Sequence, residues 1–248
     1  DMVKLDIMRP ERLVDVNRLP LTELEALDDG RLQIGALVTN TDLGYDPRVT
    51  ADYGVLSEAL LAGASTQLRN VATTGGNVMQ RTRCPYFRNP ARACNKREPG
   101  TGCSAIEGIS RNHAVLGGSD QCIAVHPSDM CVAMTALGAT VSVEGADGKR
   151  DIAFEDYHLL PGDTPEQEHD LRDGELITHV TLDAPIPGAK GHYLKLRDRA
   201  SYEFALASCA VVVALDGDTI REARVALGGV GTKPWRAHDA EAVLNGQP

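Results

Sequence analysis

Four cysteines and a pair of glycines lie close together in this chain, and their types and spacing suggest a metal centre beside a bound anion. The cysteines occupy a stretch rich in arginine, glycine and proline, at Cys84, Cys94, Cys103 and Cys122. Gly75 and Gly76 lie just before them, and because neither carries a Cβ, backbone amides there can approach an anion closely. A metal centre next to a phosphate cradle indicates electron transfer between an inorganic cluster and a nucleotide cofactor.

The cysteine spacing helps to choose among metals. It reads C-x9-C-x8-C-x18-C, whereas structural zinc sites usually present two cysteines in a C-x2–4-C knuckle. Wide, irregular spacing favours a cubane iron–sulfur cluster, with zinc and unbound thiols as alternatives. His113 lies in the same stretch and could replace one cysteine as a ligand. The arginines around the first cysteines could compensate the negative charge of the thiolates.

Polar side chains that could hold a pyrophosphate and a ribityl chain flank the glycine pair. Gln67, Arg69, Asn70 and Thr73 precede it, and Asn77 follows it. A Gly-Gly turn by itself usually marks only a tight bend, and this run is not the G-x-G-x-x-G of a Rossmann unit.

Two later groups have structural as well as functional explanations. Ser128 and Asp129 follow His126-Pro127, where they are typical of a helix start. Lys195 lies in Lys195-Leu196-Arg197, which alone indicates a charged strand end.

Composition narrows the function classes. The net charge of −10 argues against a nucleic-acid partner, which would require a basic face. No apolar run approaches the roughly 18–20 residues that cross a bilayer, and the first residues show no stretch of signal-peptide type. A chain of 248 residues does not need disulfides to fold. Cys131 and Cys209 lie in apolar patterns and are predicted to be buried small hydrophobic residues.

Periodicity predicts a mixed α and β chain. Strands are expected at 13–16, 140–143, 176–182, 192–196 and 224–227, with a hairpin formed by 24–27 and 32–38. Helices are expected at 53–62, at 127–139 with Pro127 in its first turn, and at 237–244, while 204–215 fits either type. Thr39 is a predicted helix cap. Residues 81–121 show no periodicity, and a loop of that length requires a functional or disordered explanation.

The motifs together resemble a known family. The run Gln67-x-Arg69-Asn70-x-Ala72-Thr73-x-Gly75-Gly76-Asn77 resembles the second FAD-binding motif of the flavoprotein (medium) subunits of the xanthine oxidase/molybdenum hydroxylase family. The Cys84–Cys122 loop is similar to the extra [4Fe-4S] loop of a subset of that family. Cys84-Pro85-Tyr86-Phe87, Cys94-Asn95-Lys96-Arg97 and Cys122-Ile123-Ala124-x-His126-Pro127-Ser128-Asp129 resemble the bacterial periplasmic-type aldehyde oxidoreductases most closely.

The resemblance implies a fold and a set of site residues. The fold would be α+β: a FAD-binding PCMH-type (vanillyl-alcohol-oxidase-like) α/β domain over 1–187 with an iron–sulfur loop at 81–122, then an α+β CO-dehydrogenase-flavoprotein-like domain over 188–248. The four cysteines would bind the cluster. FAD would contact Gln67, Arg69, Asn70, Thr73, Gly75, Gly76, Asn77, Ser128, Asp129 and Lys195. The family's first flavin motif is absent and the C-terminal domain stops early, so both domains are expected to be incomplete.

The implied role is electron transfer in a molybdenum-containing aldehyde oxidoreductase. A large molybdenum-cofactor subunit and a small [2Fe-2S] subunit would be the partners, and an external acceptor would receive the electrons. This chain would not act on aldehyde alone and would supply no catalytic residue. The complex would be periplasmic by co-export with a partner, or cytoplasmic. The alternatives are the β subunit of a 4-hydroxybenzoyl-CoA reductase-like enzyme and a non-enzymatic scaffold in which the four cysteines hold zinc.

Overall fold

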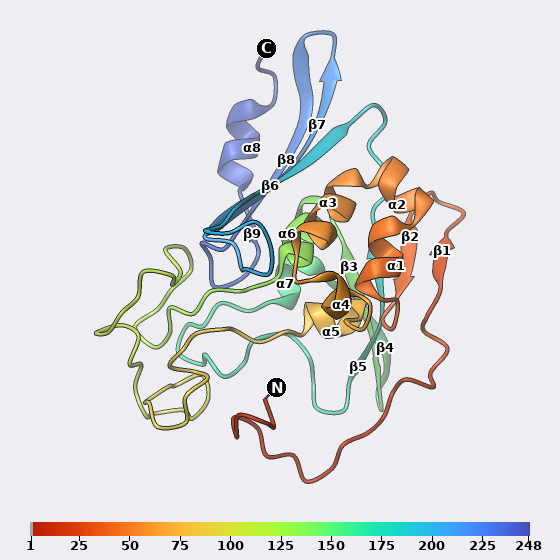
Figure 1. Ribbon diagram of the computed structural model, residues 1–248. Helices are drawn as coiled ribbons and strands as arrows, with labels where there is room; N and C mark the ends of the chain where they lie inside the picture. The colour runs from red at the N-terminus through yellow and green to blue at the C-terminus, as the bar shows by residue number, and fades with distance from the viewer. Residues whose placement is uncertain (1) are drawn as a thin grey trace.

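The chain folds around two antiparallel sheets with helices packed between and beside them (Figure 1). This computed structural model describes residues 2–248; Asp1, the first residue of the predicted N-terminal domain, lies outside the described residues. No helix in the described part of the chain is both long and apolar enough to cross a bilayer.

The first sheet has the strand order β1-β2-β5-β3-β4. Its strands are β1 (Leu24–Ala26), β2 (Leu32–Gly35), β3 (Thr140–Gly145), β4 (Gly148–Ala153) and β5 (Leu176–Leu182). Alternate residues of the central strands point into the core, so Ile34, Val141 and Val180 are fully buried. Leu32 pairs with Leu182 and Val141 with Val180, which fixes the apolar faces of three strands in one register.

Short helices accompany this sheet. They are α1 (Asn40–Tyr45), α2 (Pro47–Asp52), α3 (Gly54–Ala62), α4 (Thr66–Arg69), α5 (Thr74–Val78), α6 (Asp129–Ala136) and α7 (Phe154–Tyr157). Of these, α5 packs on β2 and β5, and α7 packs on β3 and β4. Helix α6 is buried on nearly all sides, since every residue from Met130 to Ala136 is buried. Such a helix belongs in the middle of a molecule, and α6 packs against α3 as well as β7 and β8 of the second sheet.

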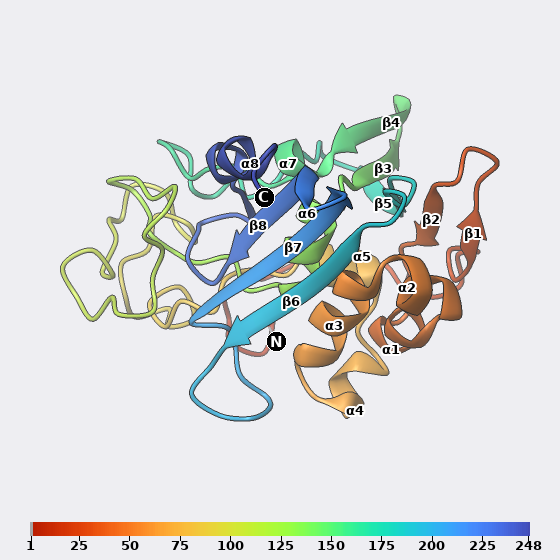
Figure 2. The same cartoon turned by 90° about the horizontal axis from the view of Figure 1, so that it is seen from above.

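The second sheet has the order β6-β7-β8-β9 and lies diagonally across α6 in the view from above (Figure 2). Its elements are β6 (Lys190–Leu196), β7 (Ala207–Asp216), β8 (Thr219–Gly228) and β9 (Trp235–Arg236), followed by α8 (His238–Leu244). Residues 183–189 connect the two sheets. The domain boundary predicted after Pro187 stays a prediction.

Between α5 and α6 the described chain forms no named helix or strand over residues 79–128, as predicted for most of this stretch. We call 79–128 the cysteine loop; it projects to one side of the molecule, in yellow and green in Figure 1. The loop is fastened to the second sheet: Val115 and Leu116 both donate backbone hydrogen bonds to the Val230 carbonyl, at 2.9 and 3.0 Å. Leu116 in turn accepts one from the Thr232 amide at 3.1 Å.

The predicted elements mostly exist, with three corrections. The strand predicted at 13–16 is absent, because Leu13 and Val14 are exposed and pair with no other strand. Pro127 does not lie in the first turn of its helix, since Ser128 is the N-cap and α6 begins at Asp129. The glycine turn is the start of helix α5, capped by Thr73, whose Oγ1 accepts from the Gly76 amide at 3.2 Å.

Candidate functional site

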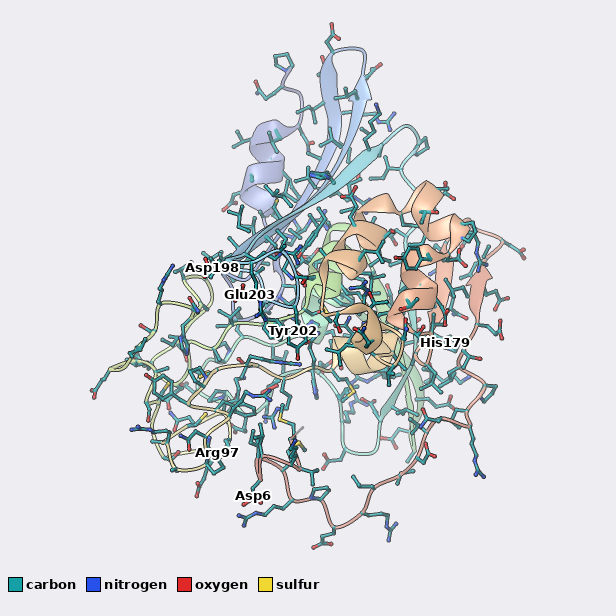
Figure 3. All side chains as sticks on the ribbon, in the orientation of Figure 1. Asp6, Arg97, His179, Asp198, Tyr202 and Glu203 are labelled. Atoms are coloured by element: carbon teal, nitrogen blue, oxygen red, sulfur yellow. The ribbon has the colours of Figure 1, made fainter. Side chains whose placement is uncertain are left out.

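A cavity of about 410 Å³ lies where the cysteine loop meets the start of α6 and the segment between β6 and β7. Its walls include Arg83, Arg111 and His113 from the loop and Ser128 and Asp129 from α6, and the 198–206 segment closes the side toward the second sheet. Figure 3 labels Asp198 and Glu203 on that side, well apart from Arg97 in the loop. We call this space the main cavity.

Four of the predicted flavin-site residues form two adjacent hydrogen-bonded pairs at the start of α6. Ser128 Oγ donates to Asn77 Oδ1 at 2.8 Å, which ties α6 to α5. The neighbouring Asp129 accepts from Lys195 Nζ of β6, also at 2.8 Å. The fold therefore brings Asn77, Ser128, Asp129 and Lys195 together from three elements that lie far apart in sequence.

The ion pair in this group is buried. The side chains of Lys195 and Asp129 are 4% and 10% exposed. The second oxygen of Asp129 accepts from the Tyr193 hydroxyl at 2.6 Å, and burial together with this carboxylate raises the pKa of Tyr193. The tyrosine therefore stays a hydrogen-bond donor at neutral pH, and both oxygens of Asp129 are held in place.

The two glycines have different surroundings. A Cβ on Gly75 would lie 3.1 Å from the Ala36 Cβ, so this glycine allows α5 to pack on the chain after β2. Its amide donates to the Ala36 carbonyl at 2.8 Å and is therefore not free for an anion. Gly76 is exposed, and a Cβ there would meet only Thr73 Oγ1, at 3.0 Å. Only Gly76 leaves open space that a ligand could fill.

The remaining predicted flavin residues lie on or beside α4. Arg69 donates to the Gly63 carbonyl at 2.7 Å, while its Nε is buried without a hydrogen-bond partner among the described residues. Asn70 Oδ1 accepts from the Thr41 hydroxyl at 2.6 Å, and Gln67 is exposed. Arg69 and Asn70 thus brace the turns around α4, and none of the three lines the main cavity.

All four predicted cluster cysteines line a second, small cavity inside the loop, together with Phe87 and Lys96. Cys94 and Cys103 face each other across an isolated antiparallel bridge. Every cysteine in the described chain is a free thiol. Burial raises the pKa of Cys84, and it raises the pKa of Cys122 to about 11. The fold thus gathers four sulfurs from across 39 residues of sequence, from position 84 to position 122, around one space.

Two of the loop arginines, Arg81 and Arg97, bind groups other than the thiols. Arg81 forms an ion pair with Glu168 at 3.0 Å and lies over the Phe87 ring, and Arg97 donates to the carbonyls of Tyr86 and Phe87. They hold the loop backbone to itself and to the 158–169 segment. Lys96 is the cation whose charge lowers the pKa of Cys122.

Sequence analysis missed a buried histidine pair. His126 and His158 pack edge to face with ring centroids 4.4 Å apart, and together they line a space of about 30 Å³. His126 Nε2 and His158 Nδ1 have no partner in the described chain. A space of this size holds a water molecule that could bond to both nitrogens. The two histidines are 32 positions apart, so no sequence pattern could have paired them.

Comparison with known proteins places the chain in a family. Residues 1–185 match the FAD-binding domain in molybdopterin dehydrogenase, and 192–248 match the CO dehydrogenase flavoprotein C-terminal domain. The chain is 56% identical over 246 residues to the aldehyde oxidoreductase FAD-binding subunit PaoB of Escherichia coli, covering 99% of this chain and 76% of that protein.

More distant relatives support the same family assignment. The glyceraldehyde dehydrogenase medium chain of Sulfolobus acidocaldarius is 27% identical, over 99% of this chain and 70% of its own length. Carbon monoxide dehydrogenase from Hydrogenophaga pseudoflava superposes with a TM-score of 0.73 at 26% identity, covering 99% of this chain and 69% of the solved one. These matches confirm the predicted α+β flavoprotein fold. The chain is a member of the family of FAD-binding subunits of molybdenum hydroxylases.

Proposed function

We propose that this chain is the electron-transfer subunit of a molybdenum-containing aldehyde oxidoreductase and carries both FAD and a [4Fe-4S] cluster. One observation carries the proposal: Cys84 lines the small cavity that the four cysteines share and also the main cavity beside Ser128 and Asp129. A cluster site and a flavin site would then share a wall. Electrons could cross from one to the other without leaving the protein.

The residues present fit FAD at the main cavity. Of the predicted flavin residues, Ser128 and Asp129 line this cavity. Gly76 and Asn77 lie behind that wall, where Asn77 Oδ1 accepts from Ser128 Oγ and the Cβ position of Gly76 is open. The Lys195–Asp129 pair holds β6 and α6 at a fixed distance from each other, so the cavity keeps its width. When bound, the flavin supplies the redox chemistry, and the protein supplies its position and electrostatics.

The residues present also fit a cluster better than a single zinc ion. Sulfurs on a tetrahedral zinc ion would be about 3.8 Å apart, as follows from a Zn–S distance of about 2.3 Å. Within residues 2–248, no three of the four sulfurs lie within 4.8 Å of one another. The wider spread suits a centre with several irons, each bound by one thiolate.

The assignment to aldehyde oxidation rests on the relative named aldehyde oxidoreductase. Under this proposal aldehyde is oxidised on a large molybdenum subunit, and a small [2Fe-2S] subunit delivers the electrons to this chain. An external acceptor then receives them. The complex would reside in the periplasm if a partner subunit carries it there, and otherwise in the cytoplasm.

Metal and flavin analysis of the purified complex tests the proposal. Cys94→Ser and Cys103→Ser should each lower iron and acid-labile sulfide and weaken the broad visible absorption. Cys209→Ser is the matched control, because this half-buried cysteine lies on β7 outside the loop. Full iron content in both loop variants would contradict the cluster.

The redox response of the complex to each substrate distinguishes the aldehyde oxidoreductase role from the 4-hydroxybenzoyl-CoA reductase-like role. Aldehyde added without acceptor should bleach the flavin absorption of the intact complex, and an aromatic acyl-CoA should not reoxidise the reduced complex. The chain alone, loaded with FAD, should oxidise no aldehyde. Turnover by the isolated chain would refute the electron-transfer role. Reoxidation of the reduced complex by 4-hydroxybenzoyl-CoA would favour the 4-hydroxybenzoyl-CoA reductase-like role, because such an enzyme passes its electrons to the acyl-CoA.

A further inference from the structure

One cysteine of the loop has a histidine against its sulfur. His113 Nε2 lies 3.3 Å from Cys84 Sγ, and the histidine is only 9% exposed. Backbone hydrogen bonds from its own amide to the Ser110 carbonyl and from Ala114 to Ile123 hold the segment in place. The contact is thus fixed by the fold around it.

The direction of this hydrogen bond follows from the chemistry of the two groups. An imidazole carries at least one N–H in either of its protonation states. A cysteine that ligates iron is a thiolate and has no proton to donate. Nε2 must therefore carry the hydrogen and donate it to sulfur. His113 then lies beside the ligand set, in contact with one cysteine, and does not take the place of a cysteine as the sequence had allowed.

We propose that His113 is a positioning residue that donates an N–H···S hydrogen bond to Cys84 and thereby raises the reduction potential of the iron–sulfur cluster. The inference rests on the cluster proposed above. Reduction adds negative charge to a cluster and its thiolates, so a donor aimed at sulfur stabilises the reduced form more than the oxidised form. The effect is exerted at the cysteine that faces the main cavity, which His113 also lines.

The other hydrogen-bond donors near the sulfurs are backbone amides, whereas His113 donates from its side chain. Backbone amides of Tyr86 and Phe87 also interact with Cys84, and the Ala124 amide lies 3.5 Å from Cys122 Sγ. These groups remain when a side chain is replaced. The contribution of His113 can therefore be removed on its own, with the backbone donors left in place.

Redox titration of the complex, followed by the electron paramagnetic resonance signal of the reduced cluster, tests the inference. His113→Phe keeps a ring of similar size against Tyr86, whose ring centroid is 6.2 Å away, but removes the donor. His113→Gln keeps an N–H near the same place. Val115→Ala changes an exposed side chain of the same segment that lines neither cavity and serves as the control.

With full iron content in every variant, the cluster potential should fall in His113→Phe, stay close to the wild-type value in His113→Gln and be unchanged in Val115→Ala. An unchanged potential in iron-loaded His113→Phe would overturn this inference and leave the proposed function standing. Wild-type complex without iron would overturn the proposed function itself. If His113→Phe does not assemble, His113→Leu gives the same comparison. Loss of iron from all three His113 variants, Gln included, would show a ligand role and refute ours.

Discussion

Removing the Asp129 carboxylate should strongly destabilise the fold, because it leaves a buried charge without its partner. Lys195 is 4% exposed, and its other contact is the Ala62 carbonyl at 3.2 Å. Asp129→Ala would also leave the buried Tyr193 hydroxyl without its acceptor. Breaking a buried ion pair by removal of one partner typically costs about 3–5 kcal/mol.

For a chain of this length that cost corresponds to a fall in Tm of roughly 10 °C. Urea unfolding of the variant gives the free energy directly, and a double-mutant cycle with Lys195→Met isolates the pair. The double variant should lose less stability than the two single variants summed, by about 2 kcal/mol, since it leaves no unpaired charge. Asp6→Ala is the control, because that carboxylate pairs with Arg9 at the exposed surface, where no measurable change is expected.

Strict additivity in the cycle, or a loss from Asp129→Ala no larger than that from Asp6→Ala, would refute this reasoning. Either result would mean that water reaches Lys195 and screens its charge.

Three other predictions concern the glycine turn, the histidine pair and the junction between loop and sheet. Gly76→Val should lower FAD content and leave iron unchanged, because its side chain would fill the open face of α5; normal flavin content would make the turn purely structural. Burial lowers the pKa of His158 from 6.5 to about 4. Between these two pH values His158 is therefore protonated in the unfolded chain and neutral in the folded chain. The contribution of His158 to the free energy of unfolding should be complete above pH 6.5 and should fall by about 3 kcal/mol toward pH 4. Urea unfolding at a series of pH values should show a smaller fall for His158→Gln. An unchanged dependence of the unfolding free energy on pH would exclude His158 as the cause. Gly117→Ala should destabilise by about 1–3 kcal/mol, because φ is +69° and a Cβ would lie 2.8 Å from Leu160 Cδ2. Gly100 has a φ of +82° and open space around it, so Gly100→Ala should lower the free energy of unfolding by less than Gly117→Ala. Equal losses in the two variants would mean that only backbone strain destabilises Gly117→Ala.

Sequence patterns predicted the elements whose residues alternate or repeat around a core. Residues 176–182 coincide with β5, and the hairpin around Gly30 exists because that residue has a φ of +84°. The same reasoning failed at Leu13 and Val14, which alternate like a strand but have no neighbouring strand to pair with. Helix α5 was missed because two glycines oppose helix formation, and only the Thr73 cap and packing on Ala36 reveal why it forms.

The candidate site, like the fold, could be predicted from the sequence only in part. Cysteine type and spacing were enough to group four residues that the fold does bring around one cavity. The other walls of the main cavity could not be predicted, because Arg111, Asp198 and Glu203 lie on segments without periodicity that meet only after folding. The partner of Arg81 could not be predicted for a related reason, because Glu168 lies 87 positions away.

The hydrogen bonds between the cysteine loop and Val230 limit how such a loop could be transferred into a related flavoprotein. Leu116 both donates to and accepts from the 230–232 turn, and Gly117 fits against Thr232 and Trp235 with no room for a side chain. A loop grafted alone into a flavoprotein that lacks it would leave those backbone groups unpaired. The cysteine loop and the turn after β8 therefore depend on each other for their backbone hydrogen bonds, although they are separate stretches of the sequence, and a graft must carry both.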